Sequence, residues 1–369
     1  MPLKLRSKIA IGLAISAFAS IPLLLVACAT TNPNYQSDKP HHTPKGFTNL
    51  NGPNVEKPLS SLLRWKREAW SNGLPKPPSQ VIDGYNFPLV KPDFNLLNSK
   101  HAKVTVTWIG HATALVQMGG LNILTDPIFS DRASPVQFSG PKRTTPTPIT
   151  LAQLPHIDLV VISHNHYDHL DRQTVLALKD QKGGSPLFAA PLGIHQWFLD
   201  QGISNVQKFD WWQTESQLPQ LKGLAVTFVP SQHWSARTPF DRHATLWGSW
   251  VFQADGFTTF FSGDTGYSKD FKDIAQRFGK FDLALIPVGA YEPRWFMQDQ
   301  HVNPAEAVAI HQDLSAALSI GIHWGTFELT DESLDQPMID LPKALDAAGV
   351  GRDKFVMLKH GETRVVLGR

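Results

Sequence analysis

The distribution of hydrophobic positions divides the chain into three parts. An apolar run extends from Ile9 to Ala27, and a stretch with almost no apolar residues follows it as far as about Pro58. From Lys103 onwards, short apolar runs predict strands, and helical patterns alternate with them. The alternation predicts an α/β or α+β sandwich in which helices cover the sheets.

Strand and helix signals can be assigned to particular segments of the chain. Strands are predicted at 104–109, 121–124, 157–162, 225–229, 250–253, 258–261, 283–287 and 355–358. Asp171 is a predicted N-cap, and Asn303 opens a helix through Leu314, with Pro304 and Glu306 in the positions of a capped first turn. An amphipathic helix is predicted at Leu59–Trp70, with packing groups at Leu62, Leu63, Trp65 and Trp70.

The first segment is predicted to be a targeting signal. Lys4, Arg6 and Lys8 precede the apolar run, as in a secretory signal, although the run is nearly long enough for an uncleaved transmembrane anchor. The end of the run, Leu25–Cys28, resembles the lipobox of bacterial lipoproteins, in which the cysteine is lipidated and becomes the N-terminus. We therefore expect a lipid anchor on Cys28 and a flexible tether over 29–58. Ala29, in place of an aspartate after the cysteine, resembles lipoproteins sorted to the outer membrane, which implies its periplasmic face, with an inner-membrane anchor as the alternative.

Composition limits the possible functions of the rest of the chain. With 42% hydrophobic and 18% charged residues, the chain can bury a full core. The net charge of +2 is too small to indicate a nucleic-acid surface. Because Cys28 is the single cysteine, neither an intrachain disulfide nor a cysteine-rich zinc site is possible. A metal site must therefore use histidine and carboxylate ligands.

Histidine and aspartate gather directly after the predicted strand 157–162. His164, His166, Asp168 and His169 offer four ligands within six residues, which is more than one ion can easily take from so short a loop. The pattern therefore indicates two neighbouring ions. Further ligands are available after other apolar runs, at His233, Asp264 and His323. Each of these three alone is compatible with a capping or hydrogen-bonding residue, but all seven together indicate a dinuclear site.

Several segments resemble the metallo-β-lactamase superfamily, and within it the hydrolases similar to N-acyl-phosphatidylethanolamine-hydrolysing phospholipase D. The resemblance extends from about Lys103 to the C-terminus. The first motif is His-x-His-x-Asp-His, and the run Gly289–Met297 is far more specific. The segments that carry the resemblance are 107–113, 124–130, 163–171, 231–234, 246–250, 289–297 and 358–362. The resemblance implies a metallo-β-lactamase αβ/βα sandwich over 103–369, preceded by an extension at 59–102 that packs on it.

The resemblance also implies a ligand set and a reaction. His164, His166 and His233 would hold one zinc ion, Asp168, His169 and His323 a second, and Asp264 would bridge them. The reaction would be phospholipase-D-type hydrolysis of a phospholipid at a membrane surface, giving N-acylethanolamine and phosphatidic acid. Asp168, Asp264 and His301 are the predicted catalytic residues, and Tyr167, His301, Gln300 and His360 the predicted substrate contacts. Asp126 is expected to orient a zinc-binding histidine, and His111 either to do the same or to be a core histidine.

Two other classes of function stay open. A lactone, a β-lactam or another phosphodiester could be the substrate of the same metal site. Alternatively, the protein could be a non-catalytic zinc-binding envelope lipoprotein, although structural zinc sites are usually closed and rich in cysteine. A redox di-iron site is disfavoured because His166 stands where iron-binding relatives usually carry an acidic residue.

Overall fold

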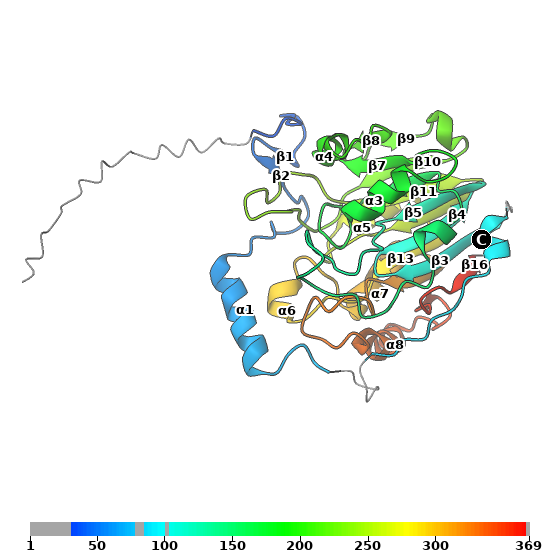
Figure 1. Cartoon of the computed structure of the whole chain (residues 1–369). Helices are drawn as coiled ribbons and strands as arrows, with labels where there is room; N and C mark the ends of the chain where they lie inside the picture. Colours follow the sequence, from blue (N-terminus) through cyan, green and yellow to red (C-terminus); the bar gives the residue numbers. More distant parts are fainter. Residues whose placement is uncertain (1–30, 78–84, 100–102, 367–369) are drawn as a thin grey trace, which may run out of the picture. The chain divides into compact units, whose positions relative to one another are not determined.

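Two mixed seven-stranded sheets form the centre of the computed structural model, which describes residues 31–77, 85–99 and 103–366 (Figure 1). The first sheet has the order β16 (Thr363–Val366), β3 (Val104–Gly110), β4 (Thr113–Met118), β5 (Leu121–Thr125), β6 (Leu159–Val161), β7 (Leu187–Pro191) and β8 (Val206–Phe209). The second has the order β15 (Phe355–Val356), β14 (Leu318–Ile322), β13 (Leu283–Pro287), β12 (Phe257–Phe261), β11 (Ser249–Ala254), β10 (Ala225–Val229) and β9 (Thr214–Glu215). In each sheet the pairing is antiparallel in one part and parallel in the other.

Helices cover the outer faces of the sheets. The helices are α1 (Leu59–Ser71), α2 (Phe94–Asn98), α3 (Arg172–Lys179), α4 (Ile194–Asp200), α5 (Asp270–Phe278), α6 (Arg294–Met297), α7 (Pro304–Asp313) and α8 (Gln336–Ala348). Val175 of α3 and Phe198 of α4 belong to the apolar cluster on the outer side of the first sheet. Fully buried Trp108 and Trp250 belong to the larger cluster, which joins the two sheets. The predicted sandwich is confirmed.

The predicted caps explain where two helices begin. The side chain of Asp171 accepts a hydrogen bond from Gln173 N–H at the start of α3. At α7, Asn303 accepts from Glu306 N–H and the Glu306 carboxylate accepts from Asn303 N–H, each at 2.9 Å. Each cap fixes the angle at which the preceding loop enters its helix.

Helix α1 lies where it was predicted, but most of its apolar residues do not pack as expected. Trp65 is buried against Phe296, with ring centroids 4.9 Å apart. By contrast, Leu63 is 61% exposed and Trp70 is 85% exposed. Leu63 and Trp70 are seven residues apart and therefore share a face of the helix, which is not the face that carries Trp65.

The segment before α1 is not the flexible tether that the composition predicted, as far as the structure describes it. From Thr31 it folds against the body through a hairpin of β1 (His42–Thr43) and β2 (Gly46–Phe47). Phe47 and Val55 are buried, and polar side chains of the segment bond to distant parts of the chain. The prediction failed because hydrogen bonds, more than apolar burial, hold this segment in place.

The predicted signal segment 1–28 and Cys28 lie outside the described residues. Within the described ranges, the helices are all too short or too polar to cross a membrane.

Candidate metal centre

The predicted metal ligands meet where strands of both sheets end. His164–His169 follows β6 of the first sheet, whereas His233, Asp264 and His323 follow β10, β12 and β14 of the second. The backbone is strained at this edge, since Asp126 and His323 have φ angles of 31° and 63°. Non-glycine residues in such conformations cluster at functional sites.

One group of ligands is formed by three histidines. His166 Nδ1 lies 2.8 Å from His164 Nε2 and 3.4 Å from His233 Nε2. His233 donates its Nδ1–H to the carbonyl of Gln300 at 2.9 Å. The Ser163 hydroxyl donates its own proton to the carboxylate of Asp126. Its Oγ can therefore only accept from His164, which donates its Nδ1–H at 2.9 Å. Both Nε2 lone pairs therefore point at His166 Nδ1, an arrangement that a cation would stabilise.

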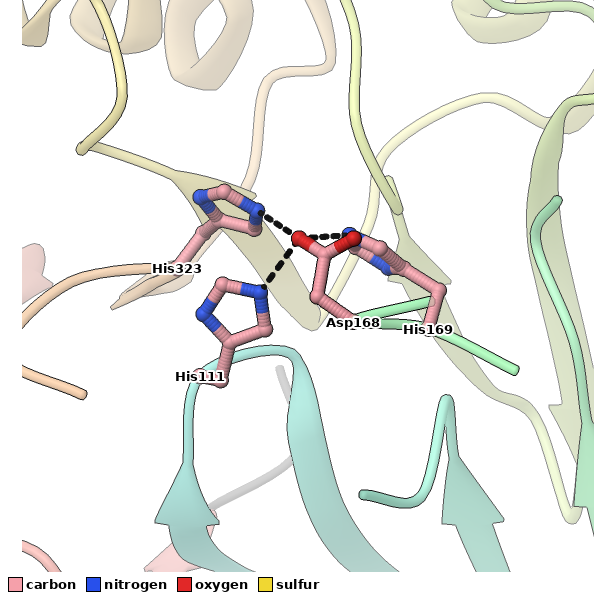
Figure 2. Close-up of side chains that lie close together, drawn as sticks. All are labelled: His111, Asp168, His169 and His323. Carbon is pink, nitrogen blue, oxygen red and sulfur yellow. Dashed lines mark hydrogen bonds and ion pairs between the residues drawn. The ribbon is translucent and has the colours of Figure 1, made fainter. Parts of the chain in front are cut away.

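A second group surrounds the carboxylate of Asp168 (Figure 2). Asp168 Oδ2 lies 2.9 Å from His111 Nε2, 3.3 Å from His169 Nε2 and 3.5 Å from His323 Nε2. His111 and His323 also overlap, with ring centroids 3.9 Å apart. Figure 2 shows the three rings turned toward the carboxylate from different segments. This group therefore brings three sequence-predicted ligands together, and His111 with them.

Asp264 lies between the two groups. Its Oδ2 is 3.1 Å from His169 Nε2, and its Oδ1 is 3.1 Å from His323 Nε2. The same carboxylate lies 4.0 Å from His164 Nε2 and 3.9 Å from His233 Nε2. A carboxylate within reach of both groups can bridge two ions.

The protonation of these residues in the absence of metal shows how well they fit a cation. Burial lowers the pKa of His166 and of His233 to about 3, so both rings are neutral. Burial also lowers the pKa of His323, but Asp264 and Asp168 outweigh it and raise this pKa to about 9. The buried atoms His169 Nε2, His323 Nε2 and Asp264 Oδ1 have no hydrogen-bond partner of acceptable geometry among the described residues. Metal ions bound here would replace protons and satisfy these atoms, so the donor set fits them.

Asp126 and His111 form hydrogen bonds to predicted metal ligands. Asp126 Oδ2 lies 2.7 Å from His169 Nδ1, and Asp126 Oδ1 accepts the Ser163 N–H at 2.7 Å. Asp126 thus fixes the ring of the predicted ligand His169, which is the arrangement that the sequence predicted for it. His111 is not an isolated core histidine, because its side chain bonds to Asp168. Its side chain supports a carboxylate, and its carbonyl accepts the N–H of the predicted ligand His323 at 2.9 Å.

A cavity of about 410 Å³ opens at the ligands, and three of the four predicted substrate contacts line it. They are Tyr167, Gln300 and His301. Tyr167 donates its hydroxyl to the carbonyl of Arg237 at 3.0 Å. His301 Nδ1 is 3.9 Å from Asp264 Oδ2 and, among the described residues, has no hydrogen-bond partner. His301 therefore places a ring nitrogen close to the predicted bridging carboxylate.

His360 lies elsewhere. Its ring is buried 4.2 Å from the Trp108 ring and 5.8 Å from the Trp324 ring, and it does not line the cavity. Its Nε2 lies 3.2 Å from Thr326 Oγ1. The loop before β16 turns the histidine inward against aromatic rings, which gives it a packing role in place of the predicted substrate contact.

Sequence reasoning missed much of the cavity wall. Lys57, Trp65, Trp234 and Arg242 line the cavity, and of these four only Trp234 stands next to a predicted metal ligand in the sequence. The only available signal is weak: Trp234 directly follows His233, and Arg242 lies in the same loop. The spacing in the sequence could not show that Leu62 and Trp65 of α1 line the same cavity as the predicted metal ligands.

Comparisons with known proteins place the chain in a family. The sequence profile of the beta-lactamase superfamily domain matches residues 121–324. N-acyl-phosphatidylethanolamine-hydrolyzing phospholipase D 1 of Caenorhabditis elegans is 37% identical over 340 residues, which cover 89% of this chain and 92% of that protein. The mitochondrial N-acyl-phosphatidylethanolamine-hydrolyzing phospholipase D of Saccharomyces cerevisiae is 38% identical over 260 residues, covering 70% of this chain and 55% of that protein.

A solved structure supports the same fold. The isothiocyanate hydrolase from Delia radicum gut bacteria superposes with a TM-score of 0.57 at 19% identity, covering 71% of this chain and 98% of that one. The motifs, the two-sheet sandwich and the sequence identity agree with one another. The chain therefore belongs to the metallo-β-lactamase superfamily, and it is a metal-dependent hydrolase similar to N-acyl-phosphatidylethanolamine-hydrolysing phospholipase D.

Proposed function

We propose that this hydrolase is a dinuclear zinc phosphodiesterase that cleaves N-acyl-phosphatidylethanolamine or a closely similar phospholipid. The products would be N-acylethanolamine and phosphatidic acid. The observation that carries the proposal is the composition of the cavity at the metal centre, where a cationic part and an apolar wall lie beside the ligands. The similarity to the nematode and yeast phospholipases supports the same substrate class.

The apolar wall suits acyl chains. The cavity is lined by Leu62 and Trp65 of α1 and by Phe296 and Met297 of α6. Trp65, Phe296 and Met297 also pack against one another in one small apolar cluster. Apolar chains gain free energy when they leave water for such a wall, in proportion to the area they bury.

The cationic part suits a phosphodiester. Lys57 and Arg242 both line the cavity. The Arg242 guanidinium stacks 3.8 Å above the Trp234 ring and bonds to the Val55 carbonyl, so its direction is fixed. Lys57 Nζ lies 3.4 Å from an Asp299 carboxylate oxygen. Two cations near the ligands favour an anionic substrate over a neutral ester.

The residues of the chain would share the work of the reaction. Zinc ions, when bound, supply hydroxide near neutral pH and neutralise phosphoryl oxygens. Asp126 would orient His169, and His111 would orient Asp168. Lys57 and Arg242 would orient the phosphodiester in the cavity. Burial lowers the pKa of His301 to about 3, so its ring is neutral at physiological pH. A neutral imidazole in this place can donate one hydrogen bond to the oxygen of the leaving alcohol.

We also propose that the protein works at a membrane surface, held there by the predicted lipid anchor on Cys28. The outer face of α1 exposes Leu59, Leu63 and Trp70 to 68%, 61% and 85%. Two loops that contribute wall residues Ala133 and Arg242 carry exposed aromatic rings as well, namely Phe138 at 84% and Phe240 at 93%. Exposed apolar groups of this kind are typical of surfaces that contact other molecules or lipid.

The test is hydrolysis of N-acyl-phosphatidylethanolamine vesicles by protein lacking residues 1–28, beside the variant Asp264→Asn. We expect N-acylethanolamine from the wild type alone, and about two zinc ions per chain by elemental analysis. If the protein binds two zinc ions but releases no product, the proposed metal centre stands and the proposed substrate is wrong. A lactone, a β-lactam and a generic phosphodiester would then be the next substrates to test. Protein that binds no zinc after reconstitution would overturn the proposal in favour of the non-catalytic alternative.

A further inference from the structure

The amide of Asn49 bonds to both backbone groups of the metal ligand His233. Asn49 Nδ2 donates to the His233 carbonyl at 2.9 Å, and Asn49 Oδ1 accepts the His233 N–H at 3.3 Å. The two residues are 184 positions apart in the chain. We infer that Asn49 is a positioning residue for His233, and that the segment before α1 is a part of the metal centre.

The hydrogen bonds of the Asn49 side chain fix the orientation of its amide group. Its side chain is buried, Nδ2 also donates to the Pro53 carbonyl at 3.2 Å, and Oδ1 also accepts the Trp247 Nε1–H at 3.0 Å. The amide thus uses both donors and both acceptor directions. A buried amide with all its bonds made has one orientation, because any rotation would leave a polar group without a partner.

The segment that carries Asn49 is clamped on both sides of it. On the N-terminal side, Lys39, His41 and His42 all contact the carboxylate of Asp210, with His41 Nε2 at 2.7 Å from Oδ1. On the C-terminal side, the carbonyl of Val55 accepts from the Arg242 guanidinium. Asn49 therefore approaches His233 from a frame that is attached at two distant points of the body.

His233 needs this support because it follows the end of β10 and, among the described residues, pairs with no neighbouring strand. Its ring is directed by the Gln300 carbonyl at Nδ1, and its backbone by Asn49. The two contacts together determine where Nε2 points. Loss of the Asn49 amide would leave the ring bond in place but release the backbone of the ligand, so the three-histidine group would bind its ion less tightly.

The experiment measures zinc affinity by chelator competition for the wild type, Asn49→Ala and a matched control, Asn32→Ala. Asn32 is a buried asparagine of the same segment, and its amide bonds to the backbone at Gly46 and Asn34, away from the ligands. We expect Asn49→Ala to weaken one of the two ions about 10- to 100-fold and to leave the other unchanged. Asn32→Ala should keep both affinities, even if its melting temperature falls. Cobalt-substituted protein should show an altered visible spectrum for the Asn49 variant only.

Equal affinities in the Asn49 variant and the wild type would overturn the inference. So would an equal loss in the Asn32 variant, because the segment would then act only through general stability. If Asn49→Ala does not fold, Asn49→Asp decides, since it keeps the acceptor for the His233 N–H and loses the donor to the carbonyl. Because no substrate is used, the result is independent of whether the proposed phospholipid is hydrolysed.

Discussion

His111 holds Asp168 with its side chain and His323 with its backbone. His111 Nε2 lies 2.9 Å from Asp168 Oδ2, and the His111 carbonyl accepts the His323 N–H at 2.9 Å. Burial lowers the pKa of His111 to about 3, so the ring is neutral and its proton at Nε2 serves this bond. One residue in the turn between β3 and β4 therefore sets the direction of two ligands of the same predicted ion.

Substitution of His111 should weaken that ion selectively. We expect His111→Ala to reduce its affinity about 10- to 100-fold, as is typical when an outer partner of a ligand is lost. His111→Gln should recover part of the loss, because its amide N–H can reach the place of Nε2. Metal content after dialysis against a chelator measures both effects. Equal metal retention in the alanine variant would show that the contact to Asp168 is dispensable.

The bridging position of Asp264 gives a second prediction. Asp264→Asn should weaken both ions and lower kcat by more than the roughly 10- to 100-fold typical of outer partners, because the amide lacks the charge that faces four ligand histidines. Metal analysis and hydrolysis assays on one preparation measure the change. Asp255→Asn, in the exposed turn between β11 and β12, is the control for loss of one negative charge and should behave as the wild type.

Metal binding should become stronger as pH rises toward 9. In metal-free protein, Asp264 and Asp168 outweigh the burial of His323 and raise its pKa from 6.5 to about 9. His323 is therefore protonated at neutral pH and must lose its proton to bind an ion. Each proton released raises the apparent affinity about tenfold per pH unit. Chelator competition from about pH 6 to about pH 8 measures the slope.

The stability of metal-free protein should change in the opposite direction over the same range. A histidine with a raised folded-state pKa contributes stability that is complete below its unfolded pKa of 6.5 and is lost as pH rises through about 9. Thermal unfolding of chelator-treated protein between these limits tests the sign. His323→Gln is the matched variant, since it keeps a polar side chain but cannot titrate. A wild-type pH slope no steeper than that of the variant would contradict this assignment of the proton.

The gathering of the predicted metal ligands could be foreseen from the sequence, because each lies at the end of a buried apolar run. The strand ends of a sandwich meet at one edge, so His233 and Asp264, which follow two predicted strands, were expected near the His164–His169 loop. His323 follows β14, which was not among the predicted strands, and only the apolar run before it pointed to this place. The caps at Asp171 and Asn303 were equally readable, since a cap depends on neighbouring residues only.

The cavity wall and the ligand supports could not be predicted in this way. Asn49 lies in a polar stretch whose composition indicates disorder, and its role depends on contacts 184 positions away. Trp65 looked like Leu63 and Trp70 in the helical pattern, but only tertiary packing decides which face of α1 meets α6. His360 shows the opposite error. Its place in a family-like motif predicted a substrate contact, but its ring packs inside the protein against Trp108.

The apolar wall should set the preference for acyl-chain length. Trp65→Ala would remove the ring that packs 4.9 Å from Phe296 and lines the cavity. We expect kcat/KM to fall about 10- to 100-fold for a long-chain substrate, with a much smaller change for a short-chain one. Trp295→Ala is the control, since Trp295 neighbours Phe296 but does not line the cavity. An equal loss for both chain lengths would point to damage at the metal centre instead of a lost chain contact.

Helix α1 should also determine how tightly the protein binds vesicles. Leu63 and Trp70 expose 61% and 85% of their surface on the side of the helix away from Trp65, so their replacement costs little folding energy. The double variant Leu63→Ser and Trp70→Ser should bind anionic phospholipid vesicles about tenfold more weakly, because each inserted apolar side chain contributes roughly 1.5 kcal/mol or less at an interface. Hydrolysis of a water-soluble phosphodiester should stay unchanged, since neither residue lines the cavity. Vesicle sedimentation beside that assay separates the two effects. Unchanged sedimentation of the variant would move the membrane contact away from α1, with the loops that carry Phe138 and Phe240 as the next surface to substitute.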